Sequence, residues 1–176
     1  MNREEIHFIV DSLFVGNELE QGRLQLEEDR WVNLKNFKDP IVVFASQGDN
    51  ITPPQQALNW IYKVYKTVDE IKRNGQVIVY IIHPRIGHLG IFVGSKIAKR
   101  EHSAIIGTVD MIEYLPPGLY EMVITDEKGD DQLLERTVEF VERGMEDILK
   151  LDDGLDDEEA FGAVSAISRY NDTMYL

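Results

Sequence analysis

Asp49 and His88 are the two side chains in this sequence whose types and positions point most directly to chemistry. Asp49 lies in the turn SQGDN just after the apolar run 41–45, and His88 lies in the turn PRIGH after a second apolar run, 77–82. A carboxylate that accepts a hydrogen bond from one imidazole nitrogen fixes the tautomer of the ring, so that the other nitrogen can act as a general base. The pair therefore indicates acid–base chemistry if the fold brings the two turns together.

The two apolar runs predict parallel strands. Both are apolar on both faces, as in a parallel sheet covered by helices on each side, and a helical pattern separates them. Strand, helix, strand is a βαβ unit, in which neighbouring strands lie about 4.8 Å apart and end at the same edge of the sheet. Functional groups of open α/β sheets gather just beyond that edge. We therefore expect the side chains of Asp49 and His88 to meet there.

The intervening segment predicts one helix. Thr52 is expected to be its N-cap, with Pro53 at the first helical position and Gln55 completing a T-x-x-Q capping box. Gly75 is the expected C-terminal stop. The apolar stripe of this helix consists of Ala57, Ile61, Val64, Val68 and Ile71.

The rest of the chain predicts further elements and a division into two parts. We expect a helix at 4–15, a small hairpin or extended segment at 22–37, a helix at 95–115, a β-hairpin beginning at Leu119, an acidic linker at 152–159 and a short helix at 160–170. The fold class is α/β. Residues 1–118 are assigned to the main domain, and 119–176 to an extension of hairpin, linker and helix.

Each of the two candidate residues also has an ordinary structural explanation. Asp within GDN and His after Gly are both common in turns, and either one alone favours a structural role by roughly three to one. Their places after successive parallel strands reverse this balance, so that a functional role is modestly favoured.

A family resemblance adds to this interpretation. The sequences FASQGDNITPPQQALNW and IIHPRIGHLGIFVG resemble the last part of α/β-hydrolase domains, where the catalytic Asp and then the His follow late strands. More narrowly, the chain is similar over roughly residues 4–170 to a polyhydroxyalkanoate synthase-like bacterial group with a domain of unknown function. The matching positions are Ser46, Asp49, Ile51 and Pro53 in an S-x-x-D-x-I-x-P pattern, and Gly87, His88 and Leu89 in a G-H-[ILV]-x-G-like loop.

The resemblance implies acyl transfer or ester hydrolysis on a hydroxyacyl ester or thioester, with Asp49 orienting His88 as the general base. Such chemistry needs a Ser on a G-x-S-x-G elbow, or a Cys in its place. The sequence has no Cys, and none of its serines stands in that pattern. We therefore expect the chain to be the C-terminal portion of a longer protein and to be inactive alone.

The composition limits the kinds of partner, cofactor and cellular location that are expected for this chain. A net charge of −14 disfavours nucleic acid, and neither a signal peptide nor a transmembrane segment is evident in the sequence. The absence of cysteine suits a reducing cytoplasm. His83, His88 and His102 do not have metal-ligand spacing, so we expect neither a metal nor another cofactor.

The expected partners are a hydroxyacyl substrate and either the remainder of the parent chain or a second copy of this one. The alternative from another class is a non-enzymatic α/β module for interaction or oligomerisation.

Overall fold

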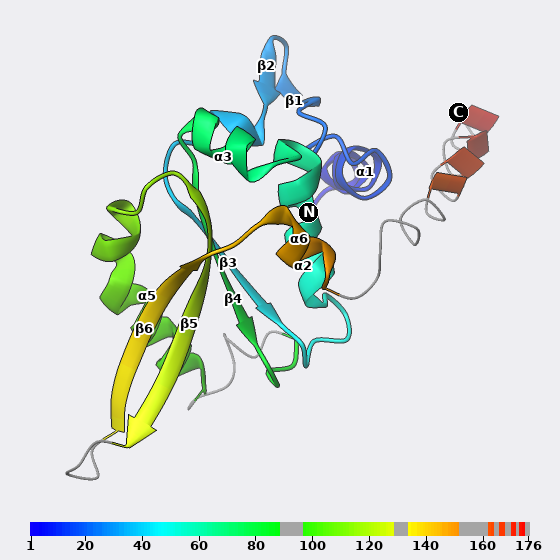
Figure 1. Ribbon diagram of the computed structural model, residues 1–176. Coiled ribbons are helices and arrows are strands. Elements are labelled where there is room, and N and C mark those ends of the chain that lie inside the picture. Colours follow the sequence, from blue (N-terminus) through cyan, green and yellow to red (C-terminus); the bar gives the residue numbers. More distant parts are fainter. Residues whose placement is uncertain are drawn as a thin grey trace. The chain divides into compact units, whose positions relative to one another are not determined.

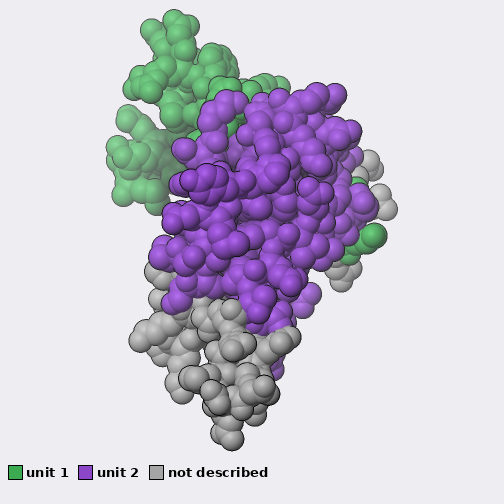
Figure 2. Space-filling model, turned by 60° about the vertical axis from the view of Figure 1, so that its left-hand side comes forward, with its two compact units in different colours: residues 1–37, 149–176 green, residues 38–148 purple. Residues whose placement is uncertain are grey.

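The computed structural model describes residues 1–88, 97–128 and 134–151, together with the helical pieces 162–163, 166–167, 170–171 and 173–174. Two compact units are present, one formed by residues 38–148 and the other by 1–37 with 149–176 (Figure 2). The first unit contains a four-stranded sheet with flanking helices, so the predicted α/β class is confirmed. The acidic linker predicted at 152–159 lies outside the described residues.

The sheet of unit 38–148 has the strand order β3-β4-β5-β6 (Figure 1). Its strands are β3 (Ile41–Ser46), β4 (Val77–His83), β5 (Gly118–Lys128) and β6 (Leu134–Glu142). β3, β4 and β5 are parallel and β6 is antiparallel, which confirms both the parallel βαβ unit and the later hairpin. Ser46 at the end of β3 pairs with His83 at the end of β4, so the two loops that follow leave the sheet at the same level.

The hairpin continues the main sheet. The sequence predicts an extension at 119–176, but β5 pairs in parallel with β4, and unit 38–148 runs through position 118. The reason is that the crossover helix α5 (Ile97–Glu113) returns the chain beside β4 before the hairpin begins. Along β6, Val138 and Phe140 pack against the core while Thr137 and Glu139 are exposed, as the alternation predicts.

Two helices replace the single helix predicted between β3 and β4. α2 (Pro54–Tyr65) ends at Lys66, whose φ of 56° breaks the helical path, and α3 (Val68–Asn74) begins after it. The side chain of Thr67 accepts a hydrogen bond from the backbone amide of Glu70 and so caps α3, which is why the chain restarts there. Gly75 ends α3 at a φ of 72°, as predicted.

The predicted capping box at the start of this segment is wrong. Pro53 is the N-cap of α2, and no side-chain hydrogen bond caps the helix. The reason is that the amide of Thr52 donates to the carboxylate of Asp49, so Thr52 belongs to the turn that precedes the helix.

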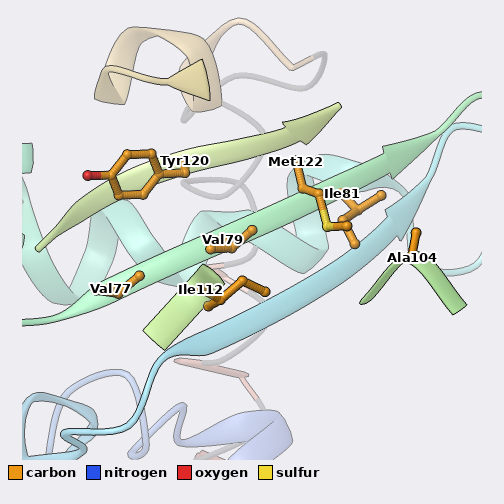
Figure 3. Close-up of a cluster of buried hydrophobic side chains, with 7 residues drawn as sticks. All are labelled: Val77, Val79, Ile81, Ala104, Ile112, Tyr120 and Met122. Atoms are coloured by element: carbon orange, nitrogen blue, oxygen red, sulfur yellow. The ribbon is translucent and has the colours of Figure 1, made fainter. Parts of the chain in front are cut away.

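Helices cover both faces of the sheet (Figure 1). Val77, Val79 and Ile81 lie along one side of β4 and face Ala104 and Ile112 of α5 (Figure 3). The residues between them, such as Ile78, point to the opposite face by the alternation of a strand, and α2 and α3 pack there. β4 is therefore the central strand of a core built on both faces. A short helix that was not predicted, α6 (Met145–Leu149), buries Met145 and Ile148.

Unit 1–37 with 149–176 holds small elements. The helix predicted at 4–15 is present as α1 (Arg3–Phe8) followed by the π-helical turn η1 (Ile9–Val15). β1 (Leu24–Glu27) and β2 (Arg30–Val32) form the predicted hairpin, and the 3₁₀ turn η2 (Leu34–Asn36) follows it. The described residues between 162 and 174 are helical, in agreement with the predicted final helix.

Candidate functional site

Asp49 lies on a turn directly after β3, and its two carboxylate oxygens make different contacts. Its Oδ1 accepts hydrogen bonds from the backbone amides of Ile51 and Thr52, both at 2.9 Å. Its own amide donates to the carbonyl of Ser46 at 3.2 Å, which closes the turn. One oxygen therefore holds the loop in shape, while Oδ2 points out of the turn toward the loop after β4.

His88 is the partner of that second oxygen. The distance from His88 Nδ1 to Asp49 Oδ2 is 2.9 Å, which confirms the contact predicted between the two side chains. An ionised carboxylate only accepts hydrogen bonds, so Nδ1 carries a proton and Nε2 of the neutral ring carries the lone pair. The side chain of His88 is 38% exposed and that of Asp49 is 13% exposed. The base is thus on the open side of the pair and the acid lies beneath it.

The surroundings of Asp49 keep its carboxylate charged. The amide of Thr52 is the largest cause of a lowered pKa for Asp49, and the hydrogen bond with His88 and the amide of Ile51 act in the same direction. Partial burial opposes them by raising the pKa, but the net pKa shift is downward. Asp49 is therefore ionised at neutral pH and favours a protonated Nδ1 on His88.

The loops after β3 and β4 are in direct contact beneath this pair. Ser46 is 4% exposed, and its hydroxyl donates to the carbonyl of Ile86 in the second loop. A Cβ on Gly48 would lie 2.7 Å from the backbone carbonyl of Arg85, so only glycine allows the loops to approach this closely. Neither contact is among the predictions from the sequence, although the G-D pair after a strand is a signal for such a close turn.

His83 has a structural role in this arrangement. It is the last residue of β4, and its Nδ1 accepts hydrogen bonds from the amides of Arg85 and Ile86, both at 3.0 Å. The ring thereby shapes the loop that carries His88.

Over residues 1–88, 97–128 and 134–151 and the short helical pieces, no group of three or more His, Asp or Glu side chains is placed to hold a metal ion. In the same ranges, none of the helices combines the length and apolar composition that crossing a membrane requires.

Comparison with known proteins places the chain in a family. All of residues 1–176 match the family described as "Protein of unknown function (DUF3141)". The chain belongs to this family. A Rhizobium meliloti relative, described as "Uncharacterized protein in ackA 5'region", is 43% identical over 181 residues. The match covers 99% of this chain but 25% of the relative, so this DUF3141 chain spans about a quarter of that protein. No solved structure matches the chain significantly.

The described part of this DUF3141 chain places no nucleophile on a strand-to-helix elbow beside His88. Ser46 ends β3 and contacts both loops, but its hydroxyl is buried and bonded to a backbone carbonyl. Ser12 lies in η1, and Ser103 lies inside α5, which begins at Ile97, so neither stands on a turn between a strand and a helix. The described site therefore consists of a carboxylate paired with an imidazole, without a serine hydroxyl placed against the ring.

Proposed function

We propose that this chain supplies the acid and the base of a catalytic triad in a polyhydroxyalkanoate synthase-like α/β-hydrolase that acts on hydroxyacyl esters or thioesters. The observation that carries the proposal is the 2.9 Å contact between Asp49 Oδ2 and His88 Nδ1, made just beyond the carboxyl ends of adjacent parallel strands. This is the order and position of the acid and base in α/β-hydrolases, where both follow strands of a parallel sheet. The absence of cysteine suits a cytoplasmic location, which is part of the proposal.

In the proposed reaction, Nε2 of His88 accepts the proton of a Ser hydroxyl or Cys thiol as that group bonds to the acyl carbonyl carbon of the substrate. The tetrahedral adduct then collapses, the bond to the leaving alcohol or thiol breaks, and the proton passes from His88 to that leaving group. In the second half of the reaction, water or the hydroxyl of a second hydroxyacyl molecule gives its proton to His88 and attacks the acyl carbon. The bond to the Ser or Cys then breaks, and His88 returns the proton to that residue. Asp49 stabilises the imidazolium ring at both steps.

The nucleophile would come from the part of the family's longer proteins that this chain does not cover. The Rhizobium meliloti relative is about four times as long as the matched segment, since the match covers 25% of it. That length leaves room for the earlier strands and the nucleophile elbow of a hydrolase domain.

The test is turnover in a full-length family member that contains this segment. We expect hydrolysis or transfer with a chromogenic 3-hydroxyacyl ester or a hydroxyacyl thioester, and a loss of about 10²–10⁴-fold in kcat in His88→Ala, the usual contribution of a general base. His7→Ala is the matched control, because His7 is an exposed histidine on α1, and it should retain full activity. Equal activity of the His88→Ala and wild-type proteins would refute the proposal.

A second candidate is an interaction module, and one observation favours it. β3 is an edge strand of the described sheet, yet its run from Ile41 to Ala45 carries no charged residue, and Val42 is 38% exposed. Edge strands usually carry charges or proline that prevent pairing with other chains. A full-length family member that shows no turnover but binds a partner through β3 would support this alternative.

A further inference from the structure

We infer that Ser46 is a positioning residue for the Asp49–His88 pair, because its hydroxyl ties the loop that carries the acid to the loop that carries the base. The inference rests on the proposed function, in which the relative placement of these two side chains matters. Ser46 itself is not proposed as a nucleophile, because its hydroxyl bonds to backbone groups of the two loops.

The hydroxyl of Ser46 joins three backbone groups from both loops. It donates to the carbonyl of Ile86, lies 3.0 Å from the carbonyl of His83, and accepts a hydrogen bond from the amide of Gly48 at 3.2 Å. A hydroxyl has one donor hydrogen and two acceptor lone pairs, so this set uses both capacities of the group. At 4% exposure the side chain is shielded from water, which would otherwise replace these bonds.

Each bond connects directly to one member of the pair. Gly48 immediately precedes Asp49, and Ile86 lies two residues before His88. Ile86 is 4% exposed, so its side chain anchors the second loop in the core while its carbonyl is held by Ser46. A shift of either loop by about 1 Å would lengthen the 2.9 Å contact beyond hydrogen-bonding distance.

The amide–carboxylate bonds of Asp49 do not fix this geometry by themselves. Ile51 and Thr52 belong to the same loop as Asp49, so their bonds shape that loop but do not attach it to the other one. Besides the Asp49–His88 bond, the two loops are joined by the bonds of the Ser46 hydroxyl and by the backbone bond from the amide of Gln47 to the carbonyl of His83. Loss of the Ser46 hydroxyl would therefore leave a weaker connection.

The experiment measures the tautomer of His88 by ¹⁵N NMR of the histidine-labelled chain, at a pH where the ring is neutral. In the wild-type chain we expect Nδ1 to be the protonated nitrogen, because Asp49 accepts from it. In Ser46→Ala we expect the ratio of the Nδ1–H to the Nε2–H tautomer to fall several-fold. Ser46→Cys keeps a weak donor of similar shape, and an intermediate ratio is expected.

Thr108→Val is the matched control. Thr108 is also a buried hydroxyl residue, 7% exposed, and donates to the carbonyl of Ala104 at 2.8 Å within α5. Its loss should lower stability by a comparable amount while leaving the His88 tautomer unchanged. Equal changes in Thr108→Val and Ser46→Ala would overturn the inference, because the effect would then be one of general stability.

The outcomes of the NMR experiment distinguish a failure of this inference from a failure of the proposed function. A wild-type chain without a dominant Nδ1–H tautomer would contradict the acid–base pair and with it the proposed function. A wild-type chain with that tautomer, unchanged in Ser46→Ala, would leave the pair intact and overturn the role of Ser46 alone. If Ser46→Ala does not fold, the ratio in Ser46→Cys decides: a value equal to wild type overturns the inference, and a reduced value supports it.

Discussion

Asp49 shows how one carboxylate can shape its own turn and also bind the imidazole of a neighbouring loop. Oδ1 accepts from two backbone amides and Oδ2 contacts the ring of His88. The loop of Asp49 therefore fixes the orientation of the carboxylate independently of His88. A carboxylate fixed in this way loses little freedom when it orients an imidazole. The turn SQGDN thus explains why an aspartate stands where glycine or asparagine alone would complete the change of direction.

Asp49→Asn should reduce the sensitivity of the fold to acid. The pKa of Asp49 is lowered in the folded state, so its contribution to the free energy of unfolding is complete above the ordinary aspartate pKa of about 3.9 and is lost as the pH falls through the lower folded pKa. The asparagine Oδ1 can still accept from Ile51 and Thr52, so the variant should fold. Urea unfolding at pH 7 and pH 3 should show a smaller difference in the variant than in the wild type.

Asp110→Asn provides the comparison for this experiment, because Asp110 is an exposed carboxylate on α5. It should keep the wild-type difference between the two pH values. An identical difference in wild type and Asp49→Asn would show that the hydrogen bonds of Asp49 do not contribute to stability in the folded chain.

At the scale of elements, two glycines with equal space around them should respond to alanine in opposite ways. A Cβ on Gly75 or on Gly107 would meet nothing within 4 Å. Gly75 ends α3 at a φ of 72°, where an L side chain is strained, so Gly75→Ala should lower the free energy of unfolding by about 1 kcal/mol. Gly107 lies within α5, where alanine favours the helix, so Gly107→Ala should raise it by about 1 kcal/mol.

Thermal or urea unfolding of both variants measures these changes. Their opposite signs are the decisive feature, because added volume is the same in each. A loss of stability in both variants would mean that α5 is not helical at position 107 or that the space there is occupied.

Elements with a strong local pattern were the predictable part of this fold. The apolar runs that became β3 and β4, the periodic segment that became α5, and the alternation along β6 all depend on residues close in sequence. The break between α2 and α3 was missed because Val64 and Val68 keep the spacing of one continuous helix, although Thr67 followed by Asp69 and Glu70 has the composition of a capped helix start.

The candidate site also has one part that could be predicted from the sequence and one part that could not. Asp49 and His88 could be found because each follows a recognisable strand, and topology alone places such ends together. The bonds from the Ser46 hydroxyl to the carbonyls of His83 and Ile86 depend on how closely two segments distant in sequence approach, which no local pattern records. Gly48 is the one local sign of that approach.

At the scale of the whole molecule, the chain by itself should associate through β3. An apolar edge strand with an exposed Val42 invites pairing, while the net charge of −14 opposes disordered aggregation. Sedimentation at micromolar concentration should therefore show a defined dimer or higher oligomer. Val42→Lys should shift the chain toward monomer, because lysine on an edge strand disfavours pairing.

Ile106→Lys is the control for that variant, since Ile106 is an exposed apolar residue, 61% exposed, on α5. It should leave the oligomer unchanged. A wild-type chain that sediments as a monomer would contradict the association and indicate that β3 is sufficiently protected within one chain.

The central claim is that His88 activates a nucleophile from outside this segment, and trapping the acyl group tests it most directly. A full-length family member incubated with a hydroxyacyl thioester, and analysed by peptide mass spectrometry, should carry the acyl group on a Ser or Cys outside the region that matches residues 1–176. In His88→Ala the rate of labelling should fall by at least about 10²-fold. Labelling at an unchanged rate in His88→Ala, or none in the wild-type protein, would contradict the account.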